Sequence, residues 1–206
     1  MHSTSTLAPA AKPPVASAVH SVWKTSIRFT LVTAVLLGIG YPLVVTGIAG
    51  LIFPHKAAGS LILKDGQIIG SELLAQSFTS DRYFHPRPSA AGNGYDATAS
   101  GGTNLAQSSK ALVDRIQGSI DKLSAENPGK PVPIDLVTTS GSGLDPDITP
   151  DAAYFQAPRV AKARGISEDQ IRQLIAQKIT GRQLGFLGEP RVNVLDLNLA
   201  LDSASK

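Results

Sequence analysis

The sequence predicts a membrane-anchored α+β protein, in which a single N-terminal transmembrane helix is followed by one exported α+β domain. Three observations predict this fold class. Residues 29–53 carry no charged side chain, no Asp or Glu occurs before Ala57, and the remaining chain mixes short strand-like runs, turns and amphipathic helical segments. Together these features are typical of a single-pass membrane protein with a folded domain on one side.

The first segment, residues 1–28, contains Pro9, Pro13 and Pro14 among Ala, Ser and Thr residues and has no helical periodicity. This composition predicts a disordered tail. The basic residues before Ala57 are Lys12, Lys24, Arg28 and Lys56, and three of them precede the apolar run. The positive-inside bias therefore predicts a cytoplasmic tail and an exported domain over residues 54–206.

The second segment, residues 29–53, is long enough to cross a bilayer, because a helix of this length spans about 37 Å and a hydrocarbon core is about 30 Å thick. One alternative is a buried helix of a soluble domain. Another is a cleaved signal peptide, whose apolar core is about 7 to 15 residues long and precedes an A-x-A-like site. The run here is longer, and Ala57-Ala58-Gly59 is a poor cleavage site. The sequence therefore favours an uncleaved membrane anchor.

Small residues recur at every fourth position of this segment: Thr30, Ala34, Gly38, Pro42, Thr46 and Gly50. We call this row the small-residue stripe. Such stripes let membrane helices approach closely, so the stripe predicts a partner helix, while Leu36, Leu37, Leu43 and Leu51 can face lipid. Pro42 lacks a backbone donor and predicts a bend near Tyr41.

The exported part begins with hairpin and loop signals. Asp65-Gly66 between residues 60–64 and 67–69 is typical of a two-residue hairpin turn. Residues 83–100, with two prolines and Asn93-Gly94, form a long extended stretch. Residues 108–124 form a helix whose apolar face is Leu112, Ile116, Ile120 and Leu123.

Two capped helices and a strand complete the predicted domain. Thr149-Pro150 starts a helix that runs to Arg164 and ends at Gly165, with a possible distortion at Pro158. Residues 167–170 form a capping box for a helix that Gly181 closes. Residues 192–201 alternate, with leucines at 195, 197, 199 and 201, and this pattern predicts a core strand.

Charge and composition exclude several function classes. Of the 19 Lys and Arg residues, four precede Ala57, which leaves 15 bases and 16 acids in the exported part. A near-neutral domain of this kind carries no nucleic-acid footprint. The chain has no Cys, which excludes disulfides, thiolate metal sites and thiol catalysis.

Three segments could carry chemistry. Residues 81–89 contain Arg82, His85 and Arg87, which could bind an anion or could brace a long loop through backbone carbonyls. Residues 135–147 contain Ser140, Ser142, Asp145 and Asp147. This segment lacks both the G-x-S-x-G elbow of a hydrolase and the EF-hand spacing of a calcium loop. Its Ser, Gly and Asp-Pro residues are ordinary turn formers. Residues 99–104 are glycine-rich but contain no P-loop.

Ordered blocks between Ile27 and Asp202 make the chain resemble the C subunit of the Kdp-type potassium-transporting ATPase of bacteria. The matching blocks are Tyr41-Pro42-Leu43, Thr46-Gly47, Phe53-Pro54, Gly59-Ser60-Leu61-Ile62, Tyr83-Phe84, Arg87-Pro88-Ser89-Ala90, Ser100-Gly101-Gly102, Asn104, residues 137–146, Arg159-Val160-Ala161, Arg164-Gly165, residues 188–195 and Leu197-Asn198. The match as a whole covers residues 27–202 and leaves only the N-terminal tail unmatched.

The resemblance implies a non-catalytic subunit that crosses the membrane once. Its implied partners are a channel-like subunit that selects potassium, a P-type subunit that hydrolyses ATP, and the lipid bilayer. The complex uses ATP, magnesium and potassium. The resemblance assigns no cofactor to this chain itself. The family is credited with stabilising assembly, with shaping potassium entry and with raising apparent ATP affinity, partly through the Ser-Gly-Gly segment. The implied exported location of Ser100 makes any effect on ATP indirect.

Partner or ion-entry contacts are expected from Arg87, Ser140, Ser142, Asp145 and Asp147, where the two aspartates could concentrate potassium by electrostatic focusing. Two rival functions stay open. One is an anchored hydrolase with His85 as the base for Ser140 or Ser142. The other is an anchored binding or sensor domain that acts without a pump.

Overall fold

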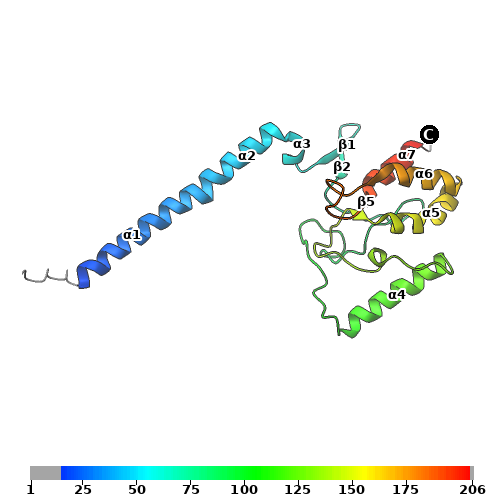
Figure 1. The fold of residues 1–206 in the computed structure, drawn as a ribbon, viewed down its shortest axis with the longest axis horizontal. Helices are drawn as coiled ribbons and strands as arrows, with labels where there is room; N and C mark the ends of the chain where they lie inside the picture. The colour runs from blue at the N-terminus through cyan, green and yellow to red at the C-terminus, as the bar shows by residue number, and fades with distance from the viewer. Residues whose placement is uncertain (1–14, 205–206) are drawn as a thin grey trace, which may run out of the picture. The chain divides into compact units, whose positions relative to one another are not determined.

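The computed structural model describes residues 15–204, with side chains from Val22 onward. Contacts divide the chain into two compact units, one ending at Ala58 and the other beginning at Gly59. Figure 1 shows the long N-terminal helix of the first unit and the mixed helix and sheet arrangement of the second. The two units are described separately below.

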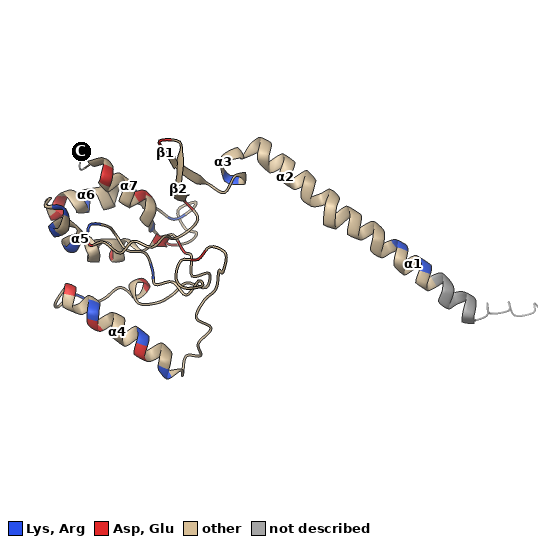
Figure 2. Cartoon of the chain, turned by 180° about the vertical axis from the view of Figure 1, so that it is seen from behind, with Lys and Arg blue, Asp and Glu red and all other residues tan. Residues whose placement is uncertain are grey.

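The first unit is a nearly continuous helix made of α1 (Val15–Val35), the π-helical segment η1 (Leu36–Gly40), α2 (Tyr41–Ile52) and the short α3 (Pro54–Ala57). Residues 22–52 are long and apolar enough to cross a membrane, and none of the most apolar stretch is buried. The single N-terminal transmembrane helix predicted from the sequence is therefore confirmed. Figure 2 shows that the Lys and Arg residues in the described part of this unit lie near its two ends.

The helix begins earlier than the sequence indicated. Residues 15–28 were assigned to a disordered tail, but α1 starts at Val15, so that part of the assignment is wrong. Neither Pro nor Gly occurs between Val15 and Leu37, and a helix that is already formed extends at little cost into such a segment. The predicted tail over residues 1–14 lies outside the described residues.

The bend that the sequence predicted near Tyr41 is not found, and a π turn takes its place. Pro42 has no N–H for an α-helical bond to Gly38, and its ring would crowd that carbonyl. The five residues before Tyr41 adopt π-helical geometry, in which the Tyr41 N–H donates to the Leu36 carbonyl. The helix accommodates the proline in this way, and α1 and α2 follow one line in Figure 1.

The second unit contains two small sheets. Strands β1 (Leu61–Lys64) and β2 (Gln67–Ser71) form the predicted hairpin, with Asp65 and Gly66 at φ of 53° and 78° as a two-residue turn of this kind requires. Strands β3 (Asp147–Ile148), β4 (Ile179–Thr180) and β5 (Arg191–Asn193) form an antiparallel sheet in the order β3-β5-β4.

Helices supply most of the regular secondary structure of this unit: α4 (Lys110–Glu126), the 3₁₀ turn η2 (Ile134–Leu136), α5 (Pro150–Arg164), α6 (Glu168–Lys178) and α7 (Val194–Ala204). The Thr149 cap, the left-handed Gly165 and the capping box at Ser167 and Gln170 are all confirmed. Helix α6 ends at Lys178, before the predicted Gly181, because β4 begins at Ile179. Figures 1 and 2 show α5, α6 and α7 grouped together and α4 apart from them.

The strand predicted over residues 192–201 is wrong beyond Asn193, because Val194–Ala204 is helix α7. The buried residues Val194, Leu197, Asn198 and Leu201 follow the i, i+3, i+4, i+7 spacing of a helix. Leucine is a good helix former, and Val194 is the last β-branched residue of the run. The alternating leucines suggested a strand, but the helix buries Leu195, Leu197 and Leu201, leaves Leu199 half-exposed, and also turns Asn198 inward.

The core is mostly aliphatic, as the low aromatic content of the chain required. It is formed by α5, α6, α7, β3 and β5 with Leu136 of η2 and one loop residue, Phe84, and includes Ile148, Val160, Ile171, Ile175, Val192, Leu197 and Leu201. Phe84 is fully buried although it lies in the long loop that precedes α4. The loops of the next section are therefore fixed to the core at that point.

Candidate functional site: a loop assembly held by Arg87

The candidate site is an assembly of three loops: residues 85–91, residues 99–102 and residues 138–147. Arg87 joins the first loop to the third. Its Nη1 donates to Asp145 Oδ2 at 3.0 Å, and its Nη2 donates to the Thr139 carbonyl and to Thr138 Oγ1, each at 3.4 Å. The guanidinium is thus used within the protein, which favours the bracing alternative over anion binding.

Ser89 makes a second connection between the same loops. Its Oγ donates to the Gly143 carbonyl at 2.6 Å and accepts from the N–H groups of Ala91 and Tyr95. Gly143 has φ of +67°, and a Cβ there would lie 2.6 Å from the Gly101 carbonyl oxygen. A side chain at 143 would therefore push the second loop away from the third.

The Ser-Gly-Gly segment forms the wall of the assembly. Ser100 Oγ donates to the Ser142 carbonyl at 3.0 Å, and the Gly101 N–H donates to the same oxygen at 2.8 Å. A Cβ on Gly102 would lie 3.3 Å from the Gly141 carbonyl oxygen. The glycines in this segment permit close packing of two loops, which explains their presence without a phosphate ligand.

The two aspartates of the third loop are both paired with arginines. Asp145 pairs with Arg87, and Asp147 Oδ2 lies 2.9 Å from Arg191 Nε. The Asp147 N–H also donates to Asp145 Oδ1 at 3.1 Å. Burial raises the pKa of Asp147, Arg191 lowers it, and Asp145 adds a further increase. The two adjacent carboxylates are thus flanked by one arginine on each side, so little of their negative charge is left uncompensated.

The structure thus brings together Arg87, Asp145 and Asp147, and places Ser140 and Ser142 in the same loop with their Oγ atoms 3.4 Å apart. The ring of His85 does not serve either serine, because His85 Nε2 lies 3.1 Å from the Ser80 carbonyl oxygen. Among the described residues, no group of three or more His, Asp or Glu side chains could hold a metal ion.

Two buried amides that the sequence did not single out hold the first loop on the core. Asn198 accepts from the Phe84 N–H at 2.8 Å and donates to the Phe84 carbonyl at 3.0 Å, and Gln156 does the same for His85 at 2.8 and 3.1 Å. Arg159 adds bonds to the carbonyls of Asp81 and Tyr83. No local pattern predicts these contacts, because each amide binds a backbone segment more than 70 positions away in the chain.

We expect Arg87→Ala to lower the stability of the domain by about 2 kcal/mol, because it leaves the half-buried Asp145 unpaired and removes the bonds to Thr138 and Thr139. The midpoint of thermal unfolding of the purified full chain should fall by about 6 °C. The matched control is Lys110→Ala, which breaks an exposed i,i+4 pair with Asp114 and should change stability by less than about 0.5 kcal/mol. Equal shifts for both variants would contradict the bracing role.

We expect acid to weaken the domain through His85. Burial lowers the pKa of His85, and Arg159 lowers it further. A histidine whose pKa is lower in the folded state contributes its full stability above its unfolded pKa, about 6.5, and loses it as the pH falls through the folded value. Thermal unfolding between pH 7 and pH 5 should therefore show a decrease in stability that is smaller in His85→Gln. An identical pH profile for the two proteins would refute this coupling.

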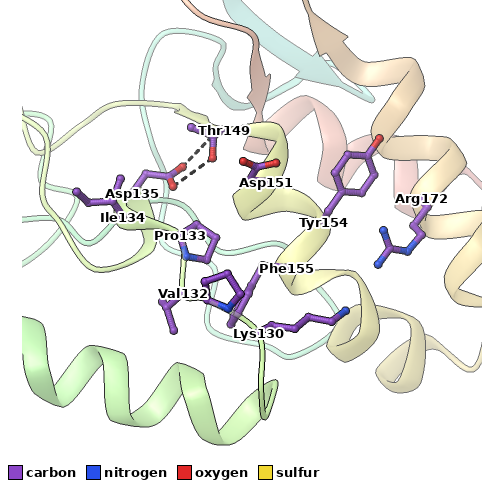
Figure 3. Close-up of a pocket in the computed structure, with 11 residues that line it drawn as sticks. Lys130, Val132, Pro133, Ile134, Asp135, Thr149, Asp151, Tyr154, Phe155 and Arg172 are labelled. Atoms are coloured by element: carbon purple, nitrogen blue, oxygen red, sulfur yellow. Dashed lines mark hydrogen bonds between the residues drawn. The ribbon is translucent and has the colours of Figure 1, made fainter.

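A separate groove of about 490 Å³ lies on the other side of η2 (Figure 3). Its walls are apolar, with Val132, Pro133 and Phe155, and its rim is charged, with Lys130 and Asp151. Asp135 at one end accepts hydrogen bonds from the N–H and Oγ1 of Thr149 at 2.7 and 3.2 Å, so its carboxylate is occupied. At the other end the Arg172 guanidinium lies 5.5 Å from the centre of the Tyr154 ring.

The small-residue stripe lies on the apolar helix of the first unit. All six of its residues are in α1, η1 or α2. A Cβ built on Gly38 or Gly50 meets no atom within 4 Å. Nothing within the described chain therefore requires glycine at these two positions.

Comparison with known proteins gives a consistent result. Residues 23–203 match the model of the family described as "K+-transporting ATPase, c chain". A protein of Koribacter versatilis named potassium-transporting ATPase KdpC subunit is 57% identical over 178 residues, covering 86% of this chain and 92% of its own. The KdpC subunits of Methylobacterium nodulans and Acidobacterium capsulatum are 55% and 57% identical, covering 85% and 87% of this chain and 96% of each relative.

Proposed function

The chain belongs to the KdpC family of potassium-transporting ATPase subunits, and on that premise we propose that it is a non-catalytic subunit that stabilises the assembly of the pump. Its partners in this proposal are the channel-like subunit that selects potassium and the P-type subunit that hydrolyses ATP. Membership of the family makes it an accessory subunit in potassium uptake. The stabilising role is the part that we infer from its residues.

The observation that carries the proposal is the unpartnered stripe on the span. The most apolar stretch between residues 22 and 52 has no buried residue within the described chain, and Gly38 and Gly50 are open. Lipid provides no hydrophobic drive for helix association, so close packing of small residues has to supply it. A transmembrane helix of the channel-like subunit or of the P-type subunit would fill the stripe.

The proposed orientation follows from the basic residues that precede the span. Lys24 and Arg28 lie at its N-terminal approach, so the N-terminus is cytoplasmic and the domain is exported. In that orientation the Ser100 segment cannot touch ATP in the cytoplasm. Any effect of this subunit on apparent ATP affinity then passes through the other subunits.

We propose that the exported domain contacts the other pump subunits through the loop assembly. The contact residues in this proposal are Arg87, Ser140, Ser142, Asp145 and Asp147. Its charge pairs argue against the electrostatic focusing expected from the two aspartates, because Arg87 and Arg191 compensate them. The subunit would instead influence potassium entry by positioning the neighbouring subunit, which the braced loops contact.

The test is a mild-detergent purification of the tagged full-length chain from its native membrane, grown in scarce potassium. Large membrane subunits should co-elute with it, and the fraction should hydrolyse ATP in response to potassium. A chain that elutes alone and without that activity would overturn the assembly role.

The groove of Figure 3 favours one alternative, an anchored binding or sensor domain that acts without the pump. That alternative requires a small apolar ligand that stabilises the chain in the absence of other subunits. The arginine pair with Tyr154 and the apolar walls suit an uncharged or weakly anionic compound. Ile134→Asp should then abolish the stabilisation by the ligand while co-purification with pump subunits is kept.

A further inference from the structure

The loop between β4 and β5, residues 181–190, is a rigid finger with an apolar tip. Leu184 and Phe186 are 83% and 68% exposed, and Leu187 is also exposed. Gln183 and Leu187 exchange two backbone hydrogen bonds of 2.8 and 2.9 Å, and Arg182 pairs with Glu189 at 2.6 Å across the base. Leu184 has φ of +53°, a conformation that disfavours a large apolar side chain. Packing inside this chain does not account for these residues.

The β1–β2 hairpin carries a second group of exposed apolar side chains. Leu63 and Ile68 are opposite each other in the strand register, and both are more than 60% exposed. Leu73, just after β2, is also exposed. A directly opposed apolar pair normally stabilises a sheet by being covered, yet within the described chain this pair is open.

The finger and the hairpin are neighbours. The Asn193 side-chain amide, at the end of β5, donates to the Glu72 carbonyl at 2.8 Å. Ile62 of the hairpin and Thr180 and Arg191 at the base of the finger line one cavity of about 420 Å³. Figure 1 shows the loop between β4 and β5 beside the hairpin. We call the exposed residues of both the apolar ledge; its members are Leu63, Ile68, Leu73, Leu184, Phe186 and Leu187.

The chain length between span and hairpin limits how far the ledge can be from the membrane. Helix α2 ends at Ile52 and β1 begins at Leu61, and four of the residues between them form α3. With α3 helical and the rest extended, this connection reaches at most about 25 Å. Because the hairpin follows this connection directly, its base cannot leave the neighbourhood of the bilayer surface.

We propose that the apolar ledge rests on the bilayer and inserts the tip of the finger into the lipid interface. Residues 183–188 carry no charge, and they combine an aromatic ring with two leucines, a composition that suits the boundary between headgroups and acyl chains. Lys56 precedes the hairpin in the chain and Lys64 lies within it, and both can meet lipid phosphates.

A weak intrinsic affinity is enough for this contact. The anchor holds the domain at the membrane, so docking is an intramolecular step with a high effective concentration of lipid. The braced base of the finger also lowers the entropy lost on insertion. The proposal depends on the membrane anchor alone and is independent of assembly with pump subunits.

The experiment uses quenching of tryptophan by lipids with brominated acyl chains. The one native Trp is Trp23, so Trp23→Phe provides a silent parent. Phe186→Trp in that parent is reconstituted, as the full chain without other subunits, into vesicles of phosphatidylcholine and phosphatidylglycerol. Brominated acyl chains should reduce its fluorescence about twofold. The matched control is Ile134→Trp, an equally exposed apolar position on the groove of Figure 3, and its fluorescence should be unchanged.

Equal fluorescence of Phe186→Trp in brominated and ordinary vesicles would overturn the proposal, as would equal quenching of Ile134→Trp. A blue shift without quenching that occurs only in the assembled pump would assign the ledge to a protein partner instead. Leu184→Trp is a second reporter at the same tip, so a folding defect in one variant does not decide the result. Co-purification, the test of the proposed function, is read separately.

Discussion

Gly38→Leu or Gly50→Leu is expected to reduce recovery of the pump complex in mild detergent by about tenfold, while the chain itself accumulates normally. Loss of close helix packing in a membrane is worth about 1–2 kcal/mol, and each 1.4 kcal/mol is a factor of ten in an association constant. Neither glycine has a neighbour within 4 Å of a built Cβ. Leucine is also the better helix former, so a loss cannot be assigned to damage within this chain.

The matched control for this prediction is Gly47→Leu. Gly47 is in the same nearly continuous helix and is equally open, and it lies about 180° around the helix from Gly38, so it is the control for Gly38→Leu. Recovery of its complex should be close to that of the unaltered chain. If all three variants assemble normally, the small-residue stripe is incidental; if all three fail equally, the helix is sensitive to bulk on every side.

Asn198→Leu is expected to destabilise the exported domain by about 2–5 kcal/mol, the largest effect of any single change considered. Asn198 is only 2% exposed, and it satisfies both the N–H and the carbonyl of Phe84. Leucine has a similar volume, so the cost comes from two buried backbone groups without partners, at about 1–3 kcal/mol each. Denaturant unfolding of the purified full chain measures it, with Asn93→Leu, at an exposed turn position, as the control.

A loss below about 0.5 kcal/mol for Asn198→Leu would mean that Phe84 finds other partners or that the loop detaches freely. The second outcome has its own signature, because release of residues 81–89 would expose their amide groups to hydrogen exchange. Rapid exchange at Phe84 and His85 in the variant, with α5 and α6 still protected, would show local detachment in place of global unfolding.

The sequence was sufficient wherever structure depends on nearby residues. The span, the Asp65-Gly66 turn, the Thr149 cap and the Ser167 capping box were all predicted correctly, because each is encoded within a few positions. The alternating leucines after Val192 led to a wrong strand prediction, because a helix can bury most of the same leucines. Only the packing of α7 on α5 and α6 decides between helix and strand.

The ion pairs of the loop assembly could not be predicted from the sequence. Arg87 and Asp145 are 58 positions apart, and only the fold shows that they form an ion pair. Asp147 in turn pairs with Arg191. The sequence suggested two aspartates with uncompensated negative charge, whereas in the fold each of them is paired with an arginine. Gln156 and Asn198 were missed because a buried amide that binds a distant backbone leaves no local pattern.

The π turn before Pro42 affects how well the small-residue stripe, which has one member at every fourth position, can contact one straight partner helix. Four α-helical residues turn through roughly 400°, so such a row drifts by about 40° at each step. A π turn holds more residues than an α turn and therefore rotates less per residue. The segment Leu36–Gly40 thus takes back part of the accumulated drift between Gly38 and Pro42. The π turn at the proline therefore reduces the total angle through which the stripe drifts around the helix axis. Thr30 and Gly50 lie closer to the same side of the helix than they would in an unbroken α-helix.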